Sequence, residues 1–138
     1  MKLEKQLRLG NLIYGCYYNE DESDDELLTE CEVLAIDLTG SSEYSIWVDS
    51  KANIEEFNNF QPIPLTEEWL LKMGFSKITF NHSTLIEYDL KESDLDVIYF
   101  DPEKPDNGFY WGSWKGGVNY VHQLQNLYFA LTGEELTL

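Results

Sequence analysis

The sequence predicts an α+β fold made mostly of antiparallel strands, with a short central helix and a longer C-terminal helix. Two observations lead to this prediction. Most of the chain alternates apolar and polar residues between turn signals, which is typical of half-buried strands. Residues 120–133 instead repeat apolar residues every three or four positions, which is typical of an amphipathic helix. The length of 138 residues suits a single domain, residues 1–138, that buries a sizeable core.

The first half of the sequence predicts three strands. Residues 8–18 and 27–38 alternate side chains between two faces, and residues 44–48 do the same after a polar turn. Within the second of these strands, the alternation places Val33 and Ile36 on opposite faces. Strands joined by short loops pair antiparallel, so we expect a three-stranded meander that forms either a sheet or a small barrel.

A short helix is predicted at the centre of the chain. Residues 54–60 indicate a helical turn, and the two prolines of residues 61–64 then favour an extended backbone. Thr66 is a good N-cap, and the two glutamates that follow it lie where the helix dipole favours negative charge. Gly74 ends the helix about two turns later. The apolar residues of this segment are expected to hold the helix against a sheet.

A second set of strands and a longer helix are predicted in the C-terminal half. The strand signals lie at residues 78–80, 86–90, 97–100 and 109–114, with polar turns between them. The last turn ends in Asn107-Gly108, a pair that tolerates positive backbone angles. In the final helix the apolar stripe consists of Val121, Leu124, Leu127, Tyr128 and Leu131, and Gly133 ends the helix.

The charge of the chain limits its partners. The 26 acidic and 9 basic residues give a net charge of -17, which argues against direct binding to nucleic acid because phosphates require Lys or Arg. A basic partner or simple solubility accounts better for such a charge. One acidic run is predicted to form a mobile hairpin loop and an acidic surface, and it contains Glu20, Asp21, Glu22, Asp24, Asp25 and Glu26.

Cysteine content and hydropathy indicate the cellular compartment. Cys16 and Cys31 are the only two cysteines, and we interpret them as reduced thiols on strands of a cytoplasmic protein. The alternative is a disulfide between neighbouring strands. No segment has the length and apolar character of a signal peptide core or a membrane span, so we expect neither export nor membrane association.

The side chains that commonly carry catalysis form no recognisable motif. His82 and His122 lie 40 positions apart, and neither has a neighbour at the spacing of metal ligands. No serine has a nucleophile-elbow setting, and the acidic segments lack calcium-loop spacing. The glycine-rich residues 108–117 lack the Gly-Lys-Ser or Gly-Lys-Thr ending that binds phosphate. We therefore predict that the protein is not an enzyme and has no cofactor and no metal site.

Two groups of residues are candidates for binding a protein partner. The first is the uncharged polar side of the C-terminal helix, where an ordinary solvated face carries Lys and Glu; its members are His122, Gln125, Asn126 and Phe129. The alternative is that sheet and loops cover this side, with its amides bonded to backbone groups. The second group is aromatic, because aromatic rings are favoured at interface cores; its members are Tyr110, Trp111 and Trp114. The alternative is that these rings pack in the core of a strand and turn.

Three segments carry a resemblance to a known family. They are residues 7–11 (LRLGN), residues 61–75 (QPIPLTEEWLLKMGF) and residues 120–136 (YVHQLQNLYFALTGEEL). In these segments the chain resembles a family of small uncharacterised proteins of bacteriophages and prophages of anaerobic gut bacteria. The family comes with no established activity, so the resemblance supplies no catalytic residue. It implies a phage origin and the cytoplasm of a bacterial host.

These observations favour a non-enzymatic acidic accessory protein of a phage or prophage that acts by binding another protein. The alternative is an inhibitor that mimics nucleic acid and occupies a host defence protein or another basic DNA-binding protein, with carboxylates in the place of phosphates. The oligomeric state is left open by the sequence.

Overall fold

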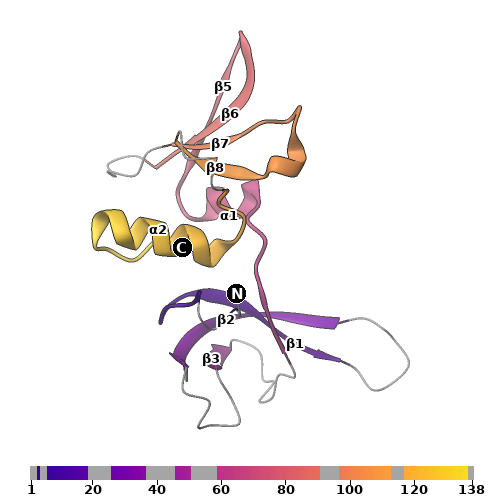
Figure 1. Cartoon of the computed structure of the whole chain (residues 1–138), viewed down its shortest axis with the longest axis vertical. Helices are drawn as coiled ribbons and strands as arrows, with labels where there is room; N and C mark the ends of the chain where they lie inside the picture. The colour runs from indigo at the N-terminus through magenta and orange to yellow at the C-terminus, as the bar shows by residue number, and fades with distance from the viewer. Residues whose placement is uncertain are drawn as a thin grey trace. The chain divides into compact units, whose positions relative to one another are not determined.

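The computed structural model describes most of the chain in two compact units. It describes residues 3, 6–18, 26–36, 46–50, 59–90, 97–112 and 117–136. The first unit spans Met1–Ile63 and the second Pro64–Leu138, and each is considered by itself. Each unit contains one four-stranded antiparallel sheet, and the second adds two helices (Figure 1). The predicted α+β class is confirmed.

The sheet of the first unit has one strand more than predicted. Its strands are β1 (Leu12–Tyr18), β2 (Glu26–Ile36), β3 (Ile46–Ser50) and β4 (Asn59–Pro62), in the order β3-β2-β1-β4. Phe60, predicted to lie in a helical turn, lies in β4 opposite Gly15 of β1; residues 54–58 lie outside the described residues. Pro62 is compatible with β4 because a strand at the edge of a sheet has a neighbour on one side only, so not every backbone N–H has to form a hydrogen bond.

A bulge in β2 changes which side chains enter the core of the first unit. The buried cluster consists of Leu7, Ile13, Val33 and Ile46, and Ile36 packs against it. The pairing of β2 with β3 shifts register between Val33 and Ala35, and one extra residue reverses the alternation beyond it. Ile36 therefore shares the core with Val33, which corrects the prediction that they lie on opposite faces.

The strand register bears on the two cysteines. Cys16 of β1 lies opposite Leu28, whereas Cys31 of β2 lies opposite Ile13. The two cysteines are therefore offset by three positions along the ladder, about 10 Å at the rise of a strand. Disulfide-bonded cysteines have Cα atoms less than about 7 Å apart. A disulfide between these neighbouring strands does not fit this register.

The second unit confirms the predicted second set of strands and both helices. Its elements are α1 (Glu67–Lys72), β5 (Ser76–Phe80), β6 (Ser83–Asp89), β7 (Ile98–Phe100), the short 3₁₀ helix η2 (Pro105–Asn107), β8 (Phe109–Trp111) and α2 (Val121–Thr132). Consecutive strands pair antiparallel in the order β5-β6-β7-β8. In Figure 1 both helices lie beneath this sheet.

The helix ends follow the chemistry predicted from the sequence. Thr66 Oγ1 accepts a hydrogen bond from the Trp69 N–H at 3.3 Å, so Thr66 is the N-cap of α1. At the start of α2 the reciprocal bond is present: Gln123, inside the helix, accepts a hydrogen bond at its Oε1 from the N–H of the N-cap residue Tyr120 at 3.3 Å. Gly133 follows α2 in the left-handed conformation, with φ of 73°. Both helices begin and end within a few residues of the predicted positions.

One face of the second sheet is covered by α1. Tyr88, Ile98 and Phe109 are buried on this face, and the rings of Tyr88 and Phe109 meet edge to face. From α1, Glu67 Oε1 accepts a hydrogen bond from the Tyr88 hydroxyl at 3.1 Å and lies 2.8 Å from Lys77 Nζ. Burial and this hydrogen bond raise the pKa of Tyr88 to about 12. The hydrogen bonds from Lys77 and Tyr88 lower the pKa of Glu67.

Candidate protein-binding surface

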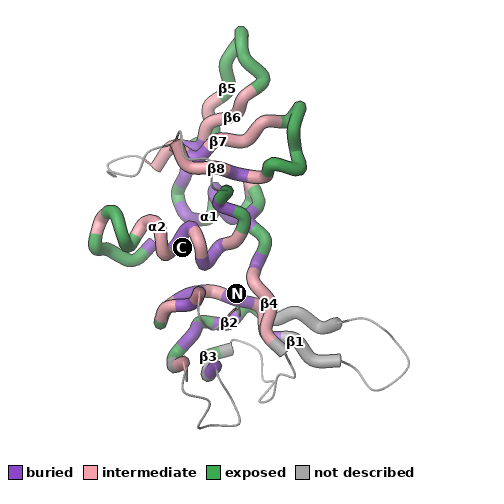
Figure 2. The backbone as a smooth tube through the Cα atoms, in the orientation of Figure 1, coloured by how far each residue is buried: buried purple, intermediate pink, exposed green. Residues whose placement is uncertain are grey.

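The polar side of α2 does not form one accessible face. His122 and Gln125 are only 0% and 3% exposed, Asn126 is half-buried, and Phe129 is 39% exposed. Figure 2 shows the same gradient along the helix, with buried residues in its first turns and exposed residues at its end. His122 and Gln125 are therefore corrected to interior residues, because an uncharged amide or imidazole is far less costly to bury than Lys or Glu. Phe129 stays accessible.

The apolar stripe of α2 follows the same gradient. Val121 and Leu124 are buried, Leu127 and Tyr128 are half-buried, and Leu131 is exposed. The predicted stripe is therefore confirmed as a buried surface only in its N-terminal part. Position along the helix decides burial as much as the helical face does.

The burial of His122 predicts a pH dependence of stability. Burial lowers the pKa of His122 from 6.5 to about 4, so the folded protein favours the neutral imidazole. The contribution of the buried, neutral His122 to the unfolding free energy is complete above pH 6.5. It is lost as the pH falls toward 4, because the unfolded chain then takes up a proton that the folded protein does not. The difference in unfolding free energy between wild type and His122→Gln, measured by urea denaturation, is expected to shrink over this interval.

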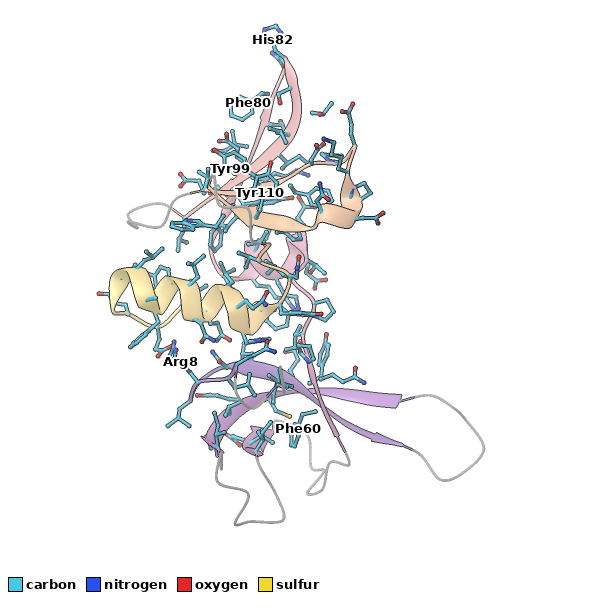
Figure 3. The ribbon with its side chains drawn as sticks, in the orientation of Figure 1. Arg8, Phe60, Phe80, His82, Tyr99 and Tyr110 are labelled. Atoms are coloured by element: carbon cyan, nitrogen blue, oxygen red, sulfur yellow. The ribbon has the colours of Figure 1, made fainter. Side chains whose placement is uncertain are left out.

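The second histidine supplies the control. His82 is exposed in the turn between β5 and β6 (Figure 3), so His82→Gln is expected to change the unfolding free energy by less than about 0.5 kcal/mol. Proton NMR of the two imidazoles checks the assignment directly. A His122 resonance that titrates near pH 6.5 would show that the side chain is solvated in solution and would contradict the prediction.

The aromatic segment of β8 divides between the two faces of its sheet. Trp111 pairs with Ile98, which pairs in turn with Tyr88, so Trp111 belongs to the face covered by α1. Tyr110 precedes it and therefore lies on the opposite face. Trp114 lies outside the described residues. The predicted aromatic group is thus not a single surface among the residues that the structure describes.

Tyr110 belongs instead to a row of side chains that crosses the sheet. The register places Tyr110 opposite Tyr99, Tyr99 opposite Glu87, and Glu87 opposite Ile78. All four side chains are half-buried. We call the set Ile78, Glu87, Tyr99 and Tyr110 the tyrosine row. Its members lie on the face away from α1, because their strand neighbours Lys77 and Tyr88 contact Glu67.

The two tyrosines of the row are in contact. Their rings stack with centroids 5.4 Å apart and planes inclined by 22°, and Figure 3 labels them side by side on neighbouring strands. Aromatic pairs at this separation attract one another beyond the effect of burial alone. The pair therefore offers a broad aromatic surface that is already ordered before any partner binds.

The charges around the tyrosine row are negative. Asp89 shares its face, two residues along β6 from Glu87. Among the described basic residues of the second unit, Lys72 pairs with Glu68 at 3.4 Å and Lys77 with Glu67 at 2.8 Å, both involving α1. The third, Lys104, precedes η2 in the loop between β7 and β8. No described Lys or Arg forms an ion pair with Glu87 or Asp89.

Sequence reasoning named only Tyr110 of this row. The alternation of β6 and β7 contains the signal for Glu87 and Tyr99, but it does not say which residues lie opposite one another. That information comes from the register of three strand pairs, which the turns and the buried face determine together.

The predicted acidic surface lies only partly within the described residues. Glu26, predicted to end the acidic loop, is the first residue of β2 and lies opposite Tyr18. Glu20, Asp21, Glu22, Asp24 and Asp25 lie outside the described residues. In the part of the chain that is described, no group of three or more His, Cys, Asp or Glu residues is placed to hold a metal ion.

The fold and the tyrosine row define an α+β protein with an aromatic and acidic sheet face. Comparison of the chain with protein-family models, curated proteins and solved structures finds no match. Among the described residues no helix is long and apolar enough to cross a membrane.

Proposed function

We propose that this chain is a non-enzymatic protein that acts by binding another protein through the tyrosine row. The observation that supports this most directly is the stacked pair of Tyr99 and Tyr110 on the sheet face away from α1. Tyrosine is enriched among the residues that contribute most to protein binding, because its ring supplies large contact area and its hydroxyl can bond at the rim. The two tyrosines of the row are thus of the residue type expected at the centre of an interface.

The setting of this activity follows from the sequence resemblance. We propose that the protein is a phage or prophage accessory protein that acts in the cytoplasm of a bacterial host. Its net charge of -17 disfavours nucleic acid as the direct partner and speeds association with a positively charged protein. The alternative, mimicry of nucleic acid, rests on this charge and on an acidic run that, apart from Glu26, lies outside the described residues, so the sheet face is the better supported surface.

Site-specific photo-crosslinking tests the proposed surface. A benzophenone side chain replaces Tyr110 in the protein expressed in host cells, and crosslinked species are identified by mass spectrometry. Matched probes replace Phe129 at the exposed end of α2 and Glu103 in the β7–β8 loop. We expect one discrete adduct from position 110 and none from position 103.

Two outcomes overturn the proposal. A discrete adduct from position 129 in the absence of one from position 110 would move the binding surface to α2. No adduct above the background of position 103 at either site would remove the support for protein binding through these surfaces. Thermal unfolding of each probe-bearing protein confirms that it is folded.

A further inference from the structure

We propose that the tyrosine row recognises an arginine side chain of the protein partner, with the guanidinium stacked on Tyr99, on the side of its ring away from Tyr110, and paired with the carboxylate of Glu87. This inference rests on the proposed function and specifies which side chain of the partner binds to the tyrosine row.

The register brings the required groups together. Glu87 lies directly opposite Tyr99, and Tyr99 lies directly opposite Tyr110. Directly opposed side chains on one sheet face have Cβ atoms about 4.5–5.5 Å apart. A planar group stacked on Tyr99, on the side away from Tyr110, can therefore reach the Glu87 carboxylate at its edge. Ile78, next in the row, supplies apolar contact for the methylene stem of a long side chain.

The charge of this face selects a cation. Glu87 and Asp89 lie on it together, and among the described residues no Lys or Arg pairs with either. The ion pairs of Lys72 and Lys77 are both made with α1. A positive group on the partner thus balances the negative charges of these two carboxylates, which no described Lys or Arg of the chain neutralises. The net charge of -17 adds a long-range attraction for such a partner.

The combination of rings and carboxylate favours arginine over lysine. The guanidinium is planar, stacks on aromatic faces, and presents several donors in one plane to a carboxylate. A lysine ammonium is compact and more strongly hydrated, so it loses more hydration on entering the same place. Cation–π attraction over tyrosine rings adds to the preference, since arginine is the more frequent partner in such contacts.

Binding of defined peptides tests the inference. Three fluorescent peptides of equal length carry arginine, lysine or citrulline at the same positions in a Gly/Ser background. Citrulline keeps the planar shape of arginine and removes its charge. By fluorescence anisotropy, the full-length protein is expected to bind the arginine peptide most tightly, the lysine peptide more weakly, and the citrulline peptide least.

Variants separate the tyrosine row from the overall charge. Glu87→Gln is expected to weaken binding of the arginine peptide roughly tenfold, the effect of losing one charge-assisted hydrogen bond. Glu103→Gln removes the same charge from the exposed β7–β8 loop and is expected to change affinity less than about twofold, because exposed distant charges are screened. Tyr99→Leu is expected to reduce the preference for arginine over lysine, whereas Tyr99→Phe keeps the ring and the preference.

Several results would overturn the inference. Equal losses of affinity for the arginine peptide in Glu87→Gln and Glu103→Gln would show that the binding is nonspecific charge attraction. Equal affinities for the citrulline and arginine peptides would exclude recognition of the cation. Self-association of the chain that Tyr110→Ala abolishes, measured by sedimentation, would assign the row to a second copy instead. If position 110 crosslinks to a protein while no arginine peptide binds, this inference fails and the proposed function stands. The Glu87→Gln comparison does not depend on the stability of the tyrosine variants.

Discussion

Replacing Leu70 by alanine is expected to destabilise the fold by about 2–5 kcal/mol, the usual cost of truncating a buried leucine. Leu70 lies in α1 and is 0% exposed. Its removal loses the transfer free energy of the deleted groups and leaves a cavity that neighbouring side chains fill only in part. The backbone N–H groups of Leu70 and Phe75 also tie this short helix to its flanks. The loss is measured by urea denaturation followed by circular dichroism.

The next residue in the helix supplies the control. Leu71 has the same chemistry and is 49% exposed. Leu71→Ala makes the same change of helix propensity, a few tenths of a kcal/mol in favour of alanine, without opening a cavity. Its stability is expected to remain within about 0.5 kcal/mol of wild type. Equal destabilisation by the two substitutions would contradict the placement of Leu70 on the buried side of α1.

Gly108→Ala is expected to be more damaging than Gly133→Ala, and to cost about 1–3 kcal/mol from backbone strain alone. Gly108 ends η2 with φ of 64° and ψ of -152°, a conformation that only glycine adopts readily. A Cβ at this position would also lie 2.5 Å from Asn119 Oδ1. The substitution therefore strains the turn before β8 and displaces the side chain of Asn119.

Two comparisons separate these causes. Gly133 after α2 also has a positive φ, of 73°, but a Cβ there meets no atom within 4 Å, so Gly133→Ala is expected to cost only about 1 kcal/mol. Adding Asn119→Ala to Gly108→Ala removes the steric conflict and leaves the strain. If Gly108→Ala proves no more destabilising than Gly133→Ala, the described backbone of the β7–β8 turn is wrong.

The proposed interaction depends on the fixed positions of the side chains in the tyrosine row as much as on which residues the row contains. Tyr99 and Tyr110 are held on paired strands and stack before any partner arrives, so less conformational entropy is lost on binding than from flexible side chains. Glu87 is likewise placed by β6. A surface of this kind gains specificity from a fixed arrangement of ring and charge, whereas the net charge acts mainly on the rate of encounter.

The sequence by itself determined the elements whose signals are local. Thr66 caps α1 through its own hydroxyl, and Gly133 ends α2 because it accepts a left-handed backbone. Strand alternation likewise located β5 to β8, since each strand needs only its own pattern of apolar and polar residues. These features depend on interactions within a few residues, so a single sequence contains the information that specifies them.

Only the tertiary structure decided the features that depend on pairing between distant segments. The pairing of β4 with β1, and the bulge that turns Ile36 into the core, depend on partner strands that local pattern does not identify. The burial of His122 depends on what packs around α2. The packing of α1 decides that the sheet face of Trp111 is covered and not the face of Tyr110. The tyrosine row is the clearest case. Glu87, Tyr99 and Tyr110 become neighbours only through register, because a shift of one residue would place each of them on the other face.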